Sequence, residues 1–294
     1  MVSNKALFNV AIQSLPILVS LYAIPVSISN MGKPLWYFYS VGLTILLLPN
    51  YFSFGTGPYL VRKLVLNTRF FSSEKWTGCL LGLMVSAATY LLISSLFFFT
   101  SNNQDVFTSS NSEFLFSGFF ILGGLITYFI IISKATLESK NDFYFLGFVR
   151  AIFASGLIIF PIFSFDSEWY YSLLVFLWSF FYLGAYMIRL GKKRVRLMFT
   201  LPKSVEKRTL LEFIKEVWPF GLFLVCWSFF LFFDRMLFKY YIDKQTLADH
   251  VTMQDLFNRV AIISGNISLV YYPTLSKVTS VPKQFLSYYY KQVA

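Results

Sequence analysis

Residues 114–133 read FLFSGFFILGGLITYFIIIS, an uncharged stretch of twenty residues. A helix of about 20 mostly apolar residues is long enough to cross the roughly 30 Å hydrocarbon core of a bilayer. Seven other stretches have a similar length and character, although the fifth, seventh and eighth in chain order contain charged residues. The sequence therefore predicts eight membrane spans, at residues 6–32, 35–60, 77–99, 114–133, 143–165, 169–188, 217–242 and 248–276.

The composition of the chain also indicates a membrane protein. Hydrophobic residues make up 56% of it and charged residues 13%, and the mean hydropathy is +0.62. Soluble domains average roughly 45–50% apolar and about 25% charged residues, so the charges here are too few to cover a soluble surface. Ten-residue segments of alternating hydrophobicity, which are typical of β-barrels, do not occur. The predicted fold class is all-α, a polytopic membrane helical bundle of about eight transmembrane helices.

The distribution of lysine and arginine predicts the orientation. Residues 101–113 and 164–168, between predicted spans, contain neither. The alternate connecting segments hold most of the basic residues: Lys5, four between Arg62 and Lys75, Lys134 and Lys140, nine between Arg189 and Lys215, and Lys277, Lys283 and Lys291. Basic loops remain in the cytoplasm, so both termini are predicted to be cytoplasmic. The first span is too long for a signal peptide and lacks a cleavage site, so we expect it to remain as a helix.

The basic segment 191–216 divides the chain into a six-span region, residues 1–190, and a two-span region with a tail, residues 217–294. It is the longest polar stretch and begins with four basic residues among its first six. One interpretation is contact with anionic lipid head groups. The favoured interpretation is a cytoplasmic linker that only sets the topology.

Prolines and polar residues interrupt the first two spans. Pro16 and Pro49 are expected to kink or break their helices. Irregular backbone at membrane depth faces protein or lines a cavity, as in transporters. Asn9, Gln13 and Asn50 lie in the same spans and either line an aqueous cavity or hydrogen-bond to neighbouring helices, which is the usual role in bilayers. In the fourth span, Gly123 and Gly124 are expected to allow close helix packing.

Ionisable residues inside predicted spans are costly and therefore candidates for function. Arg150, Arg259 and Arg235 are the candidates for a cationic cavity that binds an anionic head group. Asp234 and Asp255 are the candidates for a coupling-ion or proton site. The alternative is structural: Asp255 and Arg259, four residues apart, pair along one helix face, and Arg150 snorkels or binds a carbonyl group.

Signatures of catalysis and of metal binding do not occur in the sequence. The only histidine is His250, and the two cysteines, Cys79 and Cys226, lie in apolar runs, where neither a disulfide nor a thiolate metal site is expected. The net charge of +11 is explained by basic residues in the predicted cytoplasmic loops, so it does not require a nucleic-acid partner. We therefore expect no enzyme activity, no cofactor, no metal and no nucleic acid.

Three stretches carry a family resemblance. The first runs from Asn9 and Pro16 through Met31-Gly32 to the aromatic residues 36–38. The second is LESKNDF at 137–143. The third, the most specific, comprises EF at 212–213, WPF at 218–220 and FDRML at 233–237, followed by YPTLS at 272–276. Together they resemble the Wzx-type O-antigen and polysaccharide flippases of the multidrug/oligosaccharidyl-lipid/polysaccharide exporter superfamily.

This resemblance implies a bacterial inner-membrane flippase. Its substrate would be a polyprenyl-diphosphate-linked oligosaccharide, an O-antigen or polysaccharide repeat unit, moved from the cytoplasmic to the periplasmic leaflet without a cofactor. The implied partners are this substrate and membrane lipid, with polysaccharide polymerase machinery or self-association as further candidates. The arginine candidates would then bind the diphosphate group.

The resemblance also implies two six-helix halves. Lys5 and Lys215 open similar proline-bearing spans 210 residues apart. The chain is therefore expected to contain a first lobe and the start of a second, truncated after helix eight. A fragment, a decayed copy and an oligomer that supplies the missing lobe all remain open.

Two other functions remain open at this point. One is a small-solute or drug exporter of the same superfamily, which is expected to have an acidic rather than an arginine-rich cavity. The other is a membrane enzyme of polysaccharide assembly, such as a polymerase, which is expected to carry a large outer loop or a catalytic cluster.

Overall fold

The computed structural model describes residues 4–53, 55–66, 74–99, 107, 109–198, 211–219, 221–224, 226, 242–243 and 245–257. Regular structure in these residues is entirely helical, and no strand occurs among them. The predicted all-α class is therefore confirmed.

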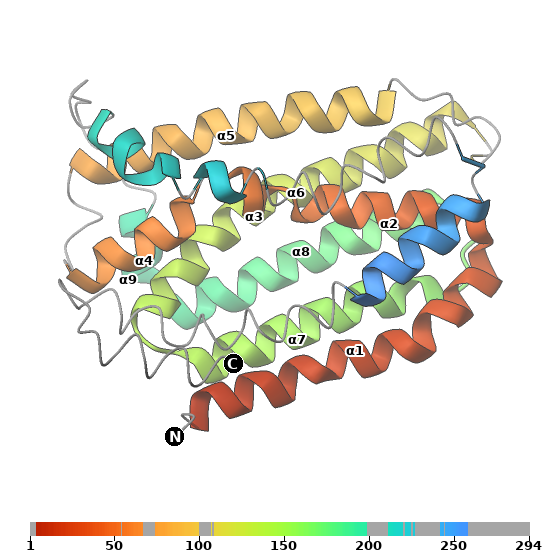
Figure 1. Cartoon of the computed structure of the whole chain (residues 1–294), viewed down its shortest axis with the longest axis horizontal. Helices are drawn as coiled ribbons and strands as arrows, with labels where there is room; N and C mark the ends of the chain where they lie inside the picture. Colours follow the sequence, from red (N-terminus) through yellow and green to blue (C-terminus); the bar gives the residue numbers. More distant parts are fainter. Residues whose placement is uncertain are drawn as a thin grey trace.

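The long helices lie side by side and alternate in direction (Figure 1). In chain order the elements are α1 (Asn4–Met31), α2 (Lys33–Leu47), α3 (Pro49–Phe52), α4 (Thr56–Leu66), α5 (Glu74–Phe99), α6 (Ser110–Ser139), α7 (Phe143–Ile159), the short 3-10 helix η2 (Phe160–Ile162), α8 (Trp169–Leu190) and α9 (Lys192–Met198). Further helical residues follow in the described part of the chain, at 211–219, 221–224, 226 and 245–257.

Five of the helical segments are long and apolar enough to cross a membrane: Leu7–Met31, Trp76–Ser95, Ser110–Ser139, Phe143–Ile162 and Trp169–Leu190. They correspond to the first, third, fourth, fifth and sixth predicted spans. The second predicted span is divided among α2, α3 and α4, each too short to cross by itself. Most of the seventh span and the second half of the eighth lie outside the described residues. The chain is thus membrane-embedded, with five of the eight predicted spans present as single continuous segments.

The surface and the helix contacts differ from those of a soluble protein, although the core is apolar. Large apolar residues such as Tyr22, Phe181 and Ile188 are exposed, the last by 84%. Serines such as Ser133 and Ser179 are completely buried between helices and bond to carbonyl groups of their own helix. Lipid tails are as apolar as leucine, so helix association in a bilayer favours small and weakly polar residues at the contacts. The exposed apolar surface therefore faces lipid.

Helix α6 occupies the centre of the bundle and contacts α2, α4, α5, α7 and α8. Its glycines allow this close packing, as the sequence predicted. A Cβ atom at Gly124 would lie 1.9 Å from the hydroxyl oxygen of Tyr90 on α5, and one at Gly123 would lie 2.7 Å from Leu46 on α2. Tyr90 is fully buried and also donates to the carbonyl oxygen of Ile121 at 3.2 Å.

The break in the second predicted span begins where α2 ends and closes where α4 begins. Pro49 starts the single turn of α3, and Gly55 has a φ of 77°, in the left-handed region that favours glycine. The prediction of an interruption at Pro49 is confirmed. At Pro16 the helix does not break, because α1 continues as a helix through both Pro16 and Pro25.

Side chains satisfy the backbone carbonyl groups that the break leaves without helical partners. Thr127 on α6 donates to the carbonyl oxygen of Leu46 at 3.3 Å, and Ser86 on α5 donates to that of Phe52. Asn50 donates within the break, to Leu47 at 3.1 Å. A broken helix persists at membrane depth only when its polar groups find such partners.

A single methyl group at Gly124 should test the central packing. We expect Gly124→Ala to destabilise the protein by about 1–3 kcal/mol, the usual cost of overpacking a tight core. Gly118→Ala on the same helix is the matched control, because a Cβ there meets nothing within 4 Å. Thermal unfolding in detergent is the measurement, and equal melting temperatures for the two variants would contradict this packing.

Candidate functional site

Arg150 forms an ion pair with Glu138 between α7 and α6. Its Nη2 atom lies 2.5 Å from Oε1 of Glu138. The two side chains are only 16% and 9% exposed. Arg150 lies about two turns into α7, and helical side chains lean toward the N-terminus of their helix. The guanidinium group therefore reaches back to the last turn of α6, where Glu138 lies.

Three more polar side chains complete this group. Lys134 lies one turn before Glu138 on α6 and interacts electrostatically with both Glu138 and Arg150. On α8, the hydroxyl oxygens of Tyr182 and Tyr186 are 2.8 Å apart, and Tyr186 also interacts electrostatically with Arg150. We call these five residues the ionic cluster. It joins α6, α7 and α8 and contains two basic side chains and one carboxylate.

Arg150 is only partly satisfied within the cluster. Burying a charge without a partner is costly, and Glu138 supplies that partner for Arg150. The Nε atom of Arg150 is buried and has no hydrogen-bond partner among the described residues. Since a guanidinium group offers five N–H donors in a fixed plane, the paired arginine retains capacity to donate.

Aromatic rings close the cluster on its α8 side. Phe153 of α7 stacks on Tyr182 with 4.0 Å between ring centroids. Phe145 packs against Tyr186 at 6.1 Å. Apolar walls of this kind exclude water, and electrostatic interactions are stronger where water is excluded.

Asn9 and Gln13 join α1 to α7. Their side-chain amides donate to the carbonyl oxygens of Phe143 at 3.3 Å and Gly147 at 3.1 Å. Both are buried, and a Cβ atom at Gly147 would lie 2.4 Å from Oδ1 of Asn9. Of the two interpretations for these residues, the structure shows the hydrogen bond to a neighbouring helix. Asn50, the third predicted lining residue, lies instead in the break between α2 and α4.

Residues 245–257 contact α2 along a second polar surface, which we call the seam. Its contacts are Lys33 Nζ to Asp249 Oδ2 at 2.7 Å, Trp36 Nε1 to Thr252 Oγ1 at 2.9 Å, and Ser40 Oγ to Asp255 Oδ2 at 3.3 Å. The residue numbers rise together on both sides, so the two helices run parallel. The blue helix in Figure 1 lies beside α2 in this way.

The sequence predicted five charged site residues, one in the fifth span and four in the seventh and eighth. One of the five lies in the seam. Asp255 accepts a hydrogen bond from Ser40 and so belongs to the seam. Arg150 belongs to the ionic cluster, and the two are therefore in separate groups of contacts. Arg259, Arg235 and Asp234 lie outside the described residues.

The sequence reasoning missed Glu138, Tyr182 and Tyr186. It ended the fourth span at Ser133 because a charge follows, whereas α6 continues to Ser139. Lys134 and Glu138 were therefore counted as loop residues. Their spacing of four along a continuing helix was a signal that they share one face.

Comparisons with known proteins provide no family for this chain. No family model, no curated protein and no solved structure matches it. Within the described residues, no group of three or more His, Cys, Asp or Glu side chains is placed to hold a metal ion.

A double-mutant cycle should measure the Arg150–Glu138 pair. We expect Glu138→Gln to destabilise the protein by about 3–5 kcal/mol, because it leaves a buried arginine uncompensated. Adding Arg150→Gln should recover a large part of this loss. The control is Asp142→Asn, since Asp142 pairs at 2.7 Å with Arg189, whose side chain is 54% exposed. That exposed pair should contribute at most about 1 kcal/mol. Equal melting temperatures for Glu138→Gln and Asp142→Asn would contradict a buried pair.

Proposed function

We propose that this protein is a bacterial inner-membrane flippase for polyprenyl-diphosphate-linked O-antigen or polysaccharide repeat units, with no enzymatic activity of its own. In this proposal residues 1–190 form a six-helix lobe, residues 191–216 a basic cytoplasmic linker, and residues 217–294 the first two helices of a second lobe. The total is about eight spans with both termini cytoplasmic. The substrate moves from the cytoplasmic to the periplasmic leaflet.

The observation that carries this proposal is the seam. The seam contacts join residues 215 or 216 positions apart in the chain, close to the 210-residue separation of Lys5 and Lys215. Helices that are equivalent by repetition and run parallel across an interface are characteristic of transporters built from parallel repeats. Polar contacts at such an interface can break and reform as two lobes rock about a central site.

The broken second span supports the same mechanism. Its outer part, α2, forms the seam, while its other part, α4, contacts residues 211–219. There Lys63 Nζ lies 2.6 Å from Glu216 Oε2, and Tyr59 packs edge-to-face against Phe213 at 5.1 Å. The two parts of one span thus contact different segments that follow the basic linker. A discontinuous helix allows one part to move while the other stays in place.

The choice of substrate rests on the resemblance and on the ionic cluster. A diphosphate offers pairs of oxygen acceptors that the planar guanidinium group of arginine can bind through two parallel hydrogen bonds. The cluster provides Arg150 and Lys134 against the single carboxylate of Glu138. A cation-exporting protein is expected to have the opposite balance.

Reconstitution of the full chain in proteoliposomes should test the substrate. We expect transfer of a fluorescent polyprenyl-diphosphate-linked oligosaccharide above the protein-free rate, and restoration of the O-antigen ladder in a flippase-deficient strain. Glu138→Gln combined with Arg150→Gln removes the cation without stranding a charge and should slow transfer about tenfold or more, the loss of one charge-assisted contact. The matched control is Asp142→Asn with Arg189→Gln.

Two outcomes would overturn this assignment. Undiminished transfer by a folded Glu138→Gln/Arg150→Gln variant would exclude the cationic site. Export of a cationic dye without transfer of the lipid-linked sugar would identify a small-solute exporter instead.

Cross-linking of the seam should test alternating access. In a Cys226→Ser background, which keeps the buried Cys79, Ser40→Cys and Asp255→Cys are joined by a short bifunctional thiol reagent. We expect transport to stop and to return after the link is cleaved. The control pair, Asp142→Cys with Arg189→Cys, lies within the six-helix lobe, and its cross-link should leave transport unchanged. Full transport with a quantitatively cross-linked seam would show that the seam does not open.

A further inference from the structure

Helix α9 presents an unexpected face at the end of α8. Gly191, with a φ of 80°, separates the two helices, so α9 begins two residues after the last residue of a membrane-spanning helix. Val195 is partly buried against the hydrophobic core and Met198 is only 3% exposed. These two residues, three apart, attach one side of α9 to the bundle.

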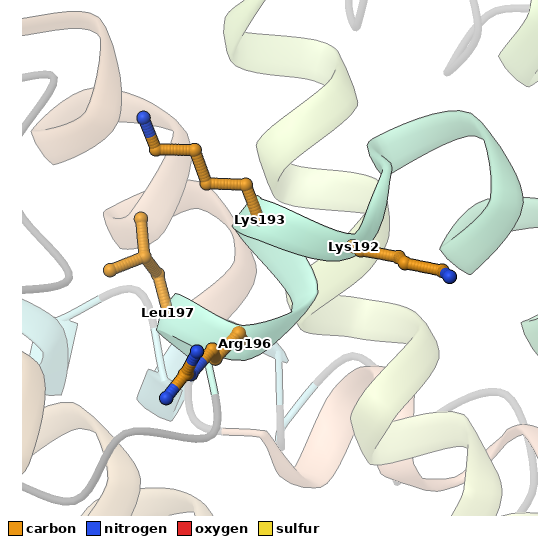
Figure 2. A pocket seen from close by; sticks show the side chains of 4 residues that line it. All are labelled: Lys192, Lys193, Arg196 and Leu197. Atoms are coloured by element: carbon orange, nitrogen blue, oxygen red, sulfur yellow. The ribbon is translucent and has the colours of Figure 1, made fainter.

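The opposite side of α9 is basic and open. Lys192, Lys193, Arg196 and Leu197 are all exposed, and together they line a shallow depression of about 350 Å³. In Figure 2 the side chains of Lys192 and Lys193 extend in opposite directions from the first turn, and Arg196 and Leu197 follow on the next. We call these four residues the α9 basic face.

We propose that the α9 basic face is a binding site for the head groups of anionic phospholipids. This site is separate from the proposed transport site and does not depend on it. Its cations meet the phosphate of a lipid such as phosphatidylglycerol, and Leu197 enters the boundary between head groups and acyl chains.

The position of the face selects lipid over a soluble anion. The end of α8 fixes the depth of α9 at the membrane surface, because only one residue separates the two helices. Cations beside an exposed leucine form the pattern of helices that lie in the interfacial plane, where polar residues meet head groups and apolar ones the acyl boundary. A free phosphate or an acidic protein segment would gain nothing from Leu197.

Two basic residues outside α9 have carboxylate partners. Arg189 pairs with Asp142, and Lys63 pairs with Glu216. Lys192 and Lys193 instead extend from a helix whose inner side alone is buried. Basic residues at a membrane surface attract anionic lipids additively.

Lipid binding by the purified full chain provides the test. Delipidated protein in detergent is titrated with phosphatidylglycerol or phosphatidylcholine, and bound lipid is counted by native mass spectrometry. We expect preferential binding of phosphatidylglycerol. Neutralising Lys192, Lys193 and Arg196 to Gln should weaken it about tenfold or more, given the strength of such contacts per cation. Leu197→Ser, with all charges kept, should weaken it less but measurably.

A charge-matched control separates a site from general attraction. The variant Arg62→Gln/Lys140→Gln/Lys215→Gln removes three exposed cations from the same end of the bundle, and should retain the preference. Equal losses in the two triple variants, or no loss in either, would overturn the proposal. If the Gln variant of α9 fails to fold, two other measurements decide the question. The variant Lys192→Arg/Lys193→Arg must retain binding, and lipid binding by the wild type must fall as the salt concentration rises. If the protein bound inorganic phosphate as well as it binds phosphatidylglycerol, the α9 basic face would be an anion site that is not specific for lipid.

Discussion

Polar groups inside a bilayer have no water to bind, so the chain itself must satisfy them. This constraint explains the main contacts of the bundle. Asn9 and Gln13 use their amides to fix α1 against α7. Thr127 and Ser86 bond to the carbonyl groups exposed where the second span breaks. Each of these bonds crosses between helices, so the same residues that satisfy the backbone also determine how the helices pack.

Charged groups need partners even more than neutral polar groups do, and two ion pairs in the bundle differ in how far they are buried. Arg150 and Glu138 are buried together between α6 and α7. In the seam, Lys33 and Asp249 remain 42% and 59% exposed, so their pair is weak and easily exchanged for water. A strong pair within the six-helix region and a weak one across the seam favour a rigid lobe with a separable interface.

Sequence patterns predicted what depends on local composition. Apolar runs identified five spans correctly, and Pro49 marked a real interruption because it removes a donor at a point where Gly55 permits a turn. Pro16 has the same chemistry, yet α1 continues through it. Glu138 was missed because the span was ended at the first charge, Lys134. Asp255 accepts a hydrogen bond from Ser40, 215 residues away in the chain, while Arg259, the partner in the structural alternative, lies outside the described residues. Such contacts arise from tertiary packing and leave no periodicity to detect.

The charge balance of the ionic cluster bears on how a diphosphate could be held. Glu138 offsets one of the two basic side chains, which leaves a surplus of one positive charge. A diphosphate that links a lipid to a sugar carries one negative charge on each phosphate, so the cluster alone neutralises only half of it. The proposed substrate therefore requires cations from outside the ionic cluster. Arg235 and Arg259, in the seventh and eighth predicted spans, are the other two arginines that the sequence predicts for substrate binding. In that arrangement the first lobe would bind one phosphate and the second lobe the other, so that full neutralisation is reached only when both lobes approach the same ligand. This would make the substrate itself the link between the two lobes.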